Sequence, residues 1–263
     1  MSEESDRKIK LSVVTAVRNG EPFIRETVDS ILSQEGDFEL EYIVRDGCSI
    51  DGTLEILSGY DDARMTVVSQ ADGGPHEAIN AGMATATGEI GCWLNADDVF
   101  EPGTLELVAR AFRADTSCRW LYGRCRIIDN NGREIRKPIT WYKNLLGFVY
   151  CRHMLLCENF INQPATFWRL DLWREIAGLN PRYHAAWDYD LWLQMADVSA
   201  PRHIRRTLSS FRRHPDSISE TSFELQFQEQ ATIAATRGNR LHQLLHRLLV
   251  RKTLMVYRMC SKE

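Results

Sequence analysis

The sequence has no long apolar run. None of its stretches approaches the ~20 apolar residues that a bilayer crossing needs, so we expect no membrane-spanning helix. The first ten residues, MSEESDRKIK, are polar and lack the apolar core that a secretory signal requires. We therefore expect neither a leader nor a membrane anchor.

Strong charge and cysteine patterns are also missing. The formal net charge of −4 gives no attraction to nucleic acid by the molecule as a whole, and we expect no nucleic-acid partner. The seven cysteines form neither a CxxC pair nor a zinc-binding spacing, which favours reduced thiols and a cytoplasmic location. No GxGxxG motif supports a nicotinamide or flavin cofactor.

What the first half does contain is an alternation of strand-like and helix-like segments. Apolar and β-branched runs at 10–17, 41–45, 65–69 and 89–94 are separated by helical patterns at 22–33, 53–58, 75–85 and 102–114. This order predicts an α/β fold with a mostly parallel, Rossmann-like sheet and helices on both faces.

Polar side chains follow each of these four strands. They are Arg18-Asn19, Asp46-Gly47, Asp72-Gly73-Gly74 and Asn95-Ala96-Asp97-Asp98. Ligands of parallel sheets bind beyond the carboxyl ends of the strands, so the four clusters predict one binding site at that rim.

The rest of the chain is less regular. We predict strands at 120–128 and 203–213, short helices at 170–177 and 189–197, and two C-terminal helices at 222–237 and 241–260. Residues 138–160 give no clear assignment.

The adjacent carboxylates of Asp97 and Asp98 follow a buried apolar strand. Such a pair is costly unless it is solvated, paired or metal-bound, and a hard divalent cation prefers carboxylate oxygens. We assign Asp97 as the metal ligand, with Asp98 as its helper or as the cap of the helix that begins near Pro102. These two residues taken alone support the metal-binding and the helix-cap interpretations equally well.

Several ordered motifs resemble glycosyltransferase family 2, whose members have the GT-A fold. They are VVTAVRNG, VRDGCSIDGT and GEIGCWLNADD, followed by WDYDLW and FRRHPDSIS. The likeness covers roughly residues 8–115, with further matches to about residue 220. It implies an inverting glycosyltransferase that moves a sugar from a nucleoside-diphosphate sugar to a hydroxyl acceptor in polysaccharide or glycoconjugate synthesis. Among the possible donors, the resemblance favours a UDP-sugar.

The resemblance also implies a division of the chain and roles for single residues. Residues 1–115 would bind the donor, residues 116–221 would hold the acceptor and the catalytic base in the same domain, and 222–263 would be a helical segment. Asp188 would be the base, Asp97 and His214 would hold Mn²⁺ or Mg²⁺, and Gln163 and Trp187 would contact the acceptor. The donor nucleotide would lie against Thr15, Ala16, Arg18, Asp46, Asp72, Gly73, Asn80, Asn95 and Ala96.

This sequence departs from the family pattern at three positions. Arg18 stands where many members have tyrosine, Asn95 replaces the first aspartate of the DxD motif, and Trp187 replaces a glutamate. Metal binding would therefore rest mainly on Asp97 and phosphate oxygens.

Plainer interpretations of the same residues stay open. Asp188 begins a helical pattern, where amides would keep its carboxylate ionised, and it could be only a helix cap. Gly73-Gly74-Pro75-His76 could bind an anion at a helix N-terminus or form an ordinary turn. His214 could equally be structural. The whole chain could be a non-catalytic nucleotide-sugar binding module or a sugar-phosphate nucleotidyltransferase.

The last helical pattern is amphipathic and basic. Arg240, Arg247, Arg251 and Arg258 share one stripe, and no acidic residue occurs from 230 to 262. The adjoining apolar face contains Leu241, Leu244, Leu245, Leu248, Met255, Val256 and Met259. This face could pack on the catalytic domain, form a homodimer through residues 240–260, or lie on the inner face of a membrane.

Overall fold

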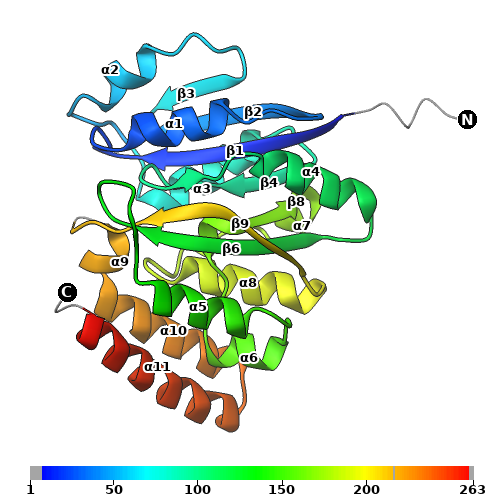
Figure 1. The fold of residues 1–263 in the computed structure, drawn as a ribbon, viewed down its shortest axis with the longest axis vertical. Coiled ribbons are helices and arrows are strands. Elements are labelled where there is room, and N and C mark those ends of the chain that lie inside the picture. The colour runs from blue at the N-terminus through cyan, green and yellow to red at the C-terminus, as the bar shows by residue number, and fades with distance from the viewer. Residues whose placement is uncertain (1–7, 216, 261–263) are drawn as a thin grey trace, which may run out of the picture.

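One mixed sheet runs through the whole protein in the computed structural model (Figure 1), which describes residues 8–215 and 217–260 without the side chains of 218, 219 and 252–260. The strand order is β3-β2-β1-β4-β8-β6-β9-β5, and β7 pairs with β6. The strands are β1 (Ile9–Val17), β2 (Phe38–Asp46), β3 (Met65–Ser69), β4 (Ile90–Trp93), β5 (Val99–Phe100), β6 (Trp120–Ile128), β7 (Glu134–Ile135), β8 (Thr166–Arg169) and β9 (Arg202–Arg212).

The first half of the sheet is parallel, as the sequence predicts. β1 pairs with β2 on one side and with β4 on the other, and β2 pairs with β3, all in parallel. β1 is buried along almost its whole length because helices cover both faces of the sheet. The α/β class expected from the sequence is therefore confirmed.

The second half of the sheet is mixed. β8 lies antiparallel between β4 and β6, whereas β6 and β9 are parallel with a register shift around Arg124. The sequence patterns predict β6 and β9 but miss β5, β7 and β8. Strands of two to four residues carry too little alternation to be read, because tertiary pairing rather than local pattern defines them.

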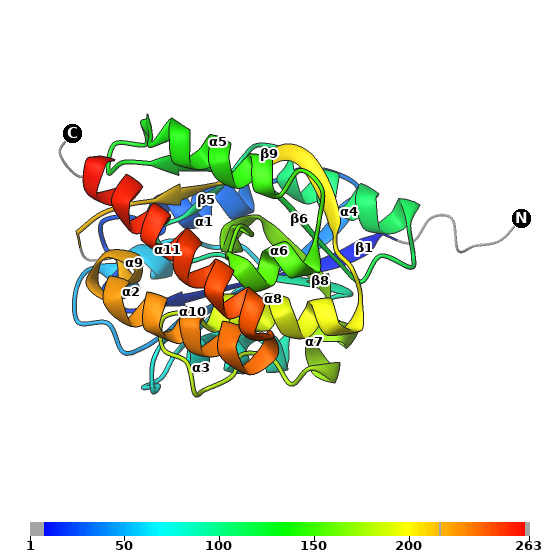
Figure 2. The same cartoon turned by 90° about the horizontal axis from the view of Figure 1, so that it is seen from below.

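Helices cover both faces and one end of the sheet. In Figures 1 and 2, α1 and α4 lie on one face and α3 and α7 on the other, while α5, α6, α10 and α11 gather below the β6–β9 end. The helices are α1 (Ile24–Leu32), α2 (Thr53–Ser58), α3 (Pro75–Thr85), α4 (Thr104–Ala114), α5 (Lys137–Leu146), α6 (Arg152–Cys157), α7 (Leu170–Glu175), α8 (Trp187–Val198), α9 (Ile218–Thr221), α10 (Phe223–Arg237) and α11 (Arg240–Cys260).

A cluster of tryptophans joins the two halves of the core. The Trp192 ring stacks 5.9 Å from Trp93 of β4 and 6.1 Å from Trp120 of β6. Trp168 of β8 lies 5.4 Å from Trp93 and 5.2 Å from Trp173. Trp192 therefore packs inward and fixes α8 against the centre of the sheet.

The C-terminal helices pack as a pair against the underside seen in Figure 2. α10 contacts α8, and α11 contacts α6. Throughout the described residues, no helix combines the length and apolar character that a bilayer crossing demands.

Candidate active site

A cavity of about 740 Å³ opens where the predicted rim meets the C-terminal helices. Its walls come from three parts of the chain. The strand-end loops contribute Ala16, Arg18, Asn95, Ala96 and Asp97, and the middle of the chain contributes Lys143, Asn159, Gln163, Trp187 and Asp188. The C-terminal part contributes His214, Gln230, His246 and Val250. Nine of the predicted site residues therefore lie around one space.

Asp97 and His214 meet at the wall of this cavity. Nε2 of His214 lies 2.9 Å from Oδ2 of Asp97, and both side chains stay partly exposed, by 14% and 22%. The His214 ring rests on the Phe23 ring, with 4.9 Å between their centroids. The structure thus holds a nitrogen and a carboxylate oxygen together, facing the cavity.

This pair suits a divalent cation whose remaining ligands are not protein side chains. A nitrogen and a carboxylate oxygen this close together are both ligand atoms that a divalent cation accepts. Among the described residues there is no cluster of three or more histidine, cysteine or acidic side chains that could hold a metal alone. Phosphate oxygens and water would have to complete the shell, as Mg²⁺ sites commonly require.

Asp98 has a different role from its neighbour. Its side chain is fully buried, with Oδ1 accepting the Arg212 backbone N–H at 2.9 Å and Oδ2 accepting Asn95 Nδ2 at 3.1 Å. Burial, reinforced by the charge of Asp97, raises the pKa of Asp98 well above its usual value. Asp98 is no helix cap, because α4 begins after Gly103 without a side-chain cap. It fastens the Asn95–Asp98 loop to β9.

Arg212 supports the same loop from the other side. Its guanidinium is buried, and it donates to the backbone oxygens of Asp97 at 2.9 Å and Asp129 at 3.1 Å, and to Glu26. It also lies 4.8 Å above the Phe23 ring. Arg213, by contrast, lines the cavity and pairs with Glu220.

A chain of amide hydrogen bonds joins the two sides of the cavity. Asn95 Nδ2 donates to Gln163 Oε1 at 3.1 Å, and Gln163 Nε2 donates to the Trp93 backbone oxygen at 2.7 Å. Asn95, which is predicted to contact the nucleotide sugar, and Gln163, which is predicted to contact the acceptor substrate, are therefore hydrogen-bonded to each other at the end of β4.

Asp188 lies in the first turn of α8, where the helical pattern placed it. Oδ1 accepts the Tyr189 N–H at 2.7 Å, and Oδ2 accepts Asn159 Nδ2 at 3.3 Å. Burial nevertheless raises the pKa of this carboxyl, and these hydrogen bonds and the charge of Lys143 oppose that rise only in part. The group is therefore a stronger base than an ordinary aspartate, and the expectation that helix amides keep it ionised stays a prediction.

The segment before α8 is held by a carboxylate from α10. Glu229 accepts the backbone N–H groups of His184, Ala185 and Ala186 at 2.8, 2.8 and 2.9 Å. The glutamate is buried, so these three donors replace the water that its charge would otherwise need. Sequence reasoning missed Glu229. A carboxylate on the same helical stripe as the buried Ile233 and Ala234 was the available signal.

His246 of α11 was also missed. Its ring is buried, Nδ1 lies 2.9 Å from the Cys157 backbone oxygen, and burial lowers its pKa. The neutral ring therefore donates through Nδ1, which leaves Nε2 as an acceptor. Nε2 has no hydrogen-bond partner within the described part of the chain, and the residue lines the cavity.

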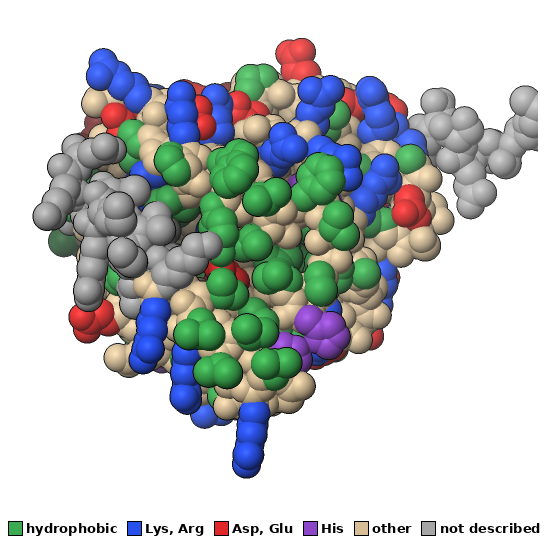
Figure 3. All heavy atoms as spheres, turned by 60° about the horizontal axis from the view of Figure 1, so that its bottom comes forward, with side chains coloured by type: hydrophobic (Ala, Val, Ile, Leu, Met, Phe, Trp, Pro, Cys, Tyr) green, Lys and Arg blue, Asp and Glu red, His purple; other side chains and the backbone are tan. Residues whose placement is uncertain are grey.

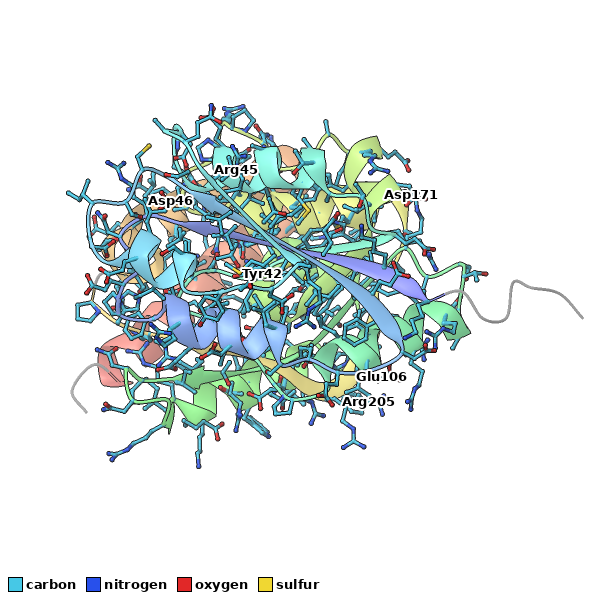
Figure 4. The ribbon with its side chains drawn as sticks, turned by 90° about the horizontal axis from the view of Figure 1, so that it is seen from above. Tyr42, Arg45, Asp46, Glu106, Asp171 and Arg205 are labelled. Atoms are coloured by element: carbon cyan, nitrogen blue, oxygen red, sulfur yellow. The ribbon has the colours of Figure 1, made fainter. Side chains whose placement is uncertain are left out.

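The remaining predicted residues cluster behind the rim beside Arg18. Figure 4 shows Tyr42 near the middle of β2, with Arg45 and Asp46 at its carboxyl end. Asp46 is buried and accepts the Ser69 hydroxyl at 2.5 Å, while the Thr15 hydroxyl accepts from Tyr42 at 3.1 Å. Gly47, which follows β2, lies close to the side chains that follow β1 and β3. A Cβ atom placed on Gly47 would be 3.5 Å from Arg18 and 3.0 Å from Asp72. The carboxyl ends of these three strands therefore converge.

Gly73 and Asn80, both predicted to lie against the donor nucleotide, have structural contacts that leave less room for a ligand. Both Gly73 and Gly74 give their backbone N–H groups to local carboxylates, those of Glu77 at 2.7 Å and Asp72 at 2.9 Å. The Asn80 amide bonds both backbone groups of Leu179 at 2.9 Å and so fixes the loop that leads to α8. Trp187 packs 6.0 Å from His76 and keeps an edge on the cavity.

Comparison with known proteins gives one family and one fold. The model described as "Glycosyl transferase family 2" matches residues 12–172. Chondroitin synthase of Escherichia coli is 27% identical over 237 residues, which cover 88% of this chain and 33% of that protein. Hyaluronan synthase of Pasteurella multocida is 25% identical over 232 residues, covering 88% and 23%. The chain thus spans a third or less of the length of these relatives.

Solved structures support the expected fold. S. aureus TarS 1–349 in complex with UDP-GlcNAc superposes with a TM-score of 0.65 at 20% identity, covering 86% of this chain and 66% of that one. The mannosyltransferase PcManGT from Pyrobaculum calidifontis, in complex with GDP-Man and Mn²⁺, gives 0.65 at 19% identity, covering 89% and 66%. The GT-A type fold predicted from the sequence is confirmed.

Proposed function

Because the chain belongs to glycosyl transferase family 2, we propose that it transfers a sugar from a nucleoside-diphosphate sugar to a hydroxyl acceptor, with inversion at the anomeric carbon. The observation that carries this proposal is the meeting of Asp97 and Asp188, 91 positions apart in the sequence, in the walls of one cavity. Chondroitin synthase, hyaluronan synthase and the UDP-GlcNAc complex support a UDP-sugar and a role in polysaccharide or glycoconjugate synthesis.

The reaction that we propose is a single displacement. Asp188 accepts the proton of the acceptor hydroxyl, whose oxygen forms a bond to the anomeric carbon. The bond from that carbon to the diphosphate oxygen breaks, and its electron pair leaves with the nucleoside diphosphate. Attack opposite the leaving group inverts the anomeric configuration. The raised pKa of Asp188 suits this role, because a stronger base removes the proton more readily once it is ionised.

The donor end of the cavity is the Arg18 and Asn95–Asp97 side. We propose that Arg18, Ala16, Thr15, Asp46 and Asp72 surround the base and ribose, with Asn95 and Ala96 on the ribose. Asp97 and His214 would hold Mn²⁺ or Mg²⁺, which supplies Lewis-acid stabilisation of the leaving diphosphate. Arg213, which also lines the cavity, would add positive charge there.

The acceptor end is the side built by Trp187, Gln163, Lys143 and His246. The amide and imidazole groups offer hydrogen bonds to hydroxyls, and the Trp187 edge offers an apolar surface to a sugar ring.

A cytoplasmic location is supported by the free thiols of the six cysteines that the structure describes.

Release of nucleoside diphosphate from a panel of nucleotide sugars, with and without Mn²⁺ and acceptor glycans, tests this function. We expect turnover with one donor class, and a loss of about 10²- to 10⁴-fold in Asp188→Asn with nucleotide binding retained. Asp171→Asn on the exposed surface of α7 is the matched control and should be fully active.

Two outcomes would replace the proposal by its alternatives. Donor binding without turnover, equal in the wild type and in Asp188→Asn, would identify a non-catalytic nucleotide-sugar binding module. Release of pyrophosphate from a nucleoside triphosphate and a sugar phosphate would identify a nucleotidyltransferase.

A further inference from the structure

The apolar stripe of α11 does not pack against the protein where the structure describes it. Leu241, Leu244, Leu245 and Leu248 recur at helical spacing and are exposed by 61%, 55%, 39% and 51%. The opposite side of the helix carries His246 and Val250 to the cavity. Of the three alternatives that the sequence left open, packing on the catalytic domain does not apply to these four leucines.

A second apolar stripe lies on α5 and the turn after it. Trp141 and Leu145, one helical turn apart, are exposed by 67% and 56%, and Phe148 and Val149 follow in the turn with 43% and 70%. Large apolar side chains scattered singly are normal on a surface, but eight on one side of the molecule are not. We call these eight residues of α5, its turn and α11 the apolar face.

The two stripes belong to one side of the molecule. Figure 2 shows α5, α6 and α11 together on the underside, and α6 links to α11 through His153 Nδ1 and His242 Nε2, which lie 3.0 Å apart. Lys143 of α5 and His246 of α11 both line the same cavity. In Figure 3 hydrophobic side chains spread across this side.

Positive charge borders the apolar face. Arg240, Arg247 and Arg251 are exposed along α11, Lys137 is exposed at the start of α5, and the Arg205 guanidinium lies 3.9 Å above the Phe148 ring. Figure 3 shows lysine and arginine side chains around the hydrophobic ones. The sequence itself has no acidic residue from 135 to 157 or from 230 to 262.

We propose that the apolar face docks on an anionic lipid bilayer, with its leucines and Trp141 in the interfacial region and its basic border on the headgroups. Exposed apolar stripes flanked by arginine and lysine have the chemistry that binds such surfaces, and tryptophan favours the interface. A second copy of the chain fits less well, because a twofold contact would bring two basic borders together. The docking does not depend on the proposed function.

Docking in this orientation has a consequence for the cavity. The inner sides of α5 and α11 form part of its wall, so a docked molecule holds the cavity beside the headgroup layer. An acceptor anchored in lipid would then reach Asp188 without leaving the membrane; this last step rests on the proposed function.

Flotation of the full chain with lipid vesicles tests the docking. Vesicles of phosphatidylcholine alone are compared with vesicles that also contain phosphatidylglycerol, at low and high salt. We expect flotation with the anionic vesicles that weakens as salt rises, and a loss of about tenfold or more in Leu244→Glu/Leu248→Glu. The control is Ile50→Glu, which adds one negative charge, half of what the double variant adds, at a side chain exposed by 92% on another part of the surface.

Folding is checked by thermal unfolding, since all three substituted side chains are exposed and the midpoints should agree with that of the wild type. Equal flotation of the double variant and the wild type, or no flotation with anionic vesicles, would overturn the proposal. A concentration-dependent dimer that the double variant loses, without vesicle binding, would show that a second copy covers the face. Loss of flotation with normal nucleotide-sugar turnover separates this proposal from the proposed function.

Discussion

At the scale of single residues, identical side chains have opposite roles according to their surroundings. Asp97 and Asp98 are adjacent, yet one faces the cavity beside His214 and the other is buried with two hydrogen-bond donors. The motif could predict that one carboxylate binds a ligand. It could not predict the support that Asp98 gives to β9, because that contact joins residues 114 positions apart.

The pH dependence of the reaction can be predicted from Asp188. Its pKa is raised, and the transfer needs its ionised form, so kcat/KM should fall as pH drops through a pKa above the ordinary aspartate value of about 3.9. Lys143 lowers that pKa, and we expect Lys143→Met to move the acidic limb of the profile to higher pH.

Lys137→Met serves as the control for that profile, because Lys137 lies on the same helix and is exposed to solvent. An acidic limb at the same pH in Lys143→Met and in the wild type would show that Asp188 does not set it.

At the scale of elements, helix α10 positions the start of α8, although the sequence pattern shows no connection between the two helices. Helix α8 carries Asp188, and the three residues before α8 are held by Glu229 of α10. The periodicity predicted both helices close to their observed bounds. It gave no contact between them, and 222–263 was therefore expected to be an appended segment. The short strands and the α5–α6 region were missed for the same reason, since their tertiary partners define them.

We predict that Glu229→Gln weakens both the fold and the reaction. Glutamine offers one acceptor oxygen where the carboxylate offers two, and its amide would face a backbone N–H. The free energy of unfolding should fall by about 1–3 kcal/mol, measured in urea. kcat should fall as well, because Asp188 loses its fixed position.

Glu224→Gln, at an exposed position in the first turn of α10, should change neither quantity appreciably. A Glu229→Gln enzyme with unchanged kcat and reduced stability would limit the glutamate to a purely structural role.

At the scale of the whole molecule, the two predicted halves share one sheet and one cavity. The division at residues 115 and 221 stays a prediction about roles. Asn95 and Gln163 are directly bonded across the boundary at residue 115, and Trp93 stacks on Trp192 across it. The family resemblance located the donor motifs, and the likeness to solved structures confirmed the fold. The cavity wall that α11 supplies could not be predicted, since nothing in a helical pattern indicates what it encloses.

Ligands that bind between these parts should stabilise the entire chain. UDP present at about 100 times its dissociation constant adds about 2.7 kcal/mol, which is several degrees in Tm for a chain of this size. We expect a further rise with Mn²⁺, since Asp97 and His214 would hold the cation against the diphosphate.

Asp97→Asn should keep the rise in Tm that UDP causes alone and lose the additional rise with Mn²⁺. The Asp171→Asn variant should keep both. If Asp97→Asn retained the full Mn²⁺ effect, the cation would have to be held elsewhere.

The antiparallel insertion of β8 also governs the order in which the chain can fold during synthesis. β4 is completed at Trp93, but its outer neighbour ends only at Arg169. Until then the emerging protein has an unprotected sheet edge beside the Trp93 ring, a template for mispairing with other chains. A fragment cut at residue 115 would keep that edge permanently, so we expect that the motifs proposed to bind the donor cannot be isolated as a stable piece simply by following their boundary in the sequence.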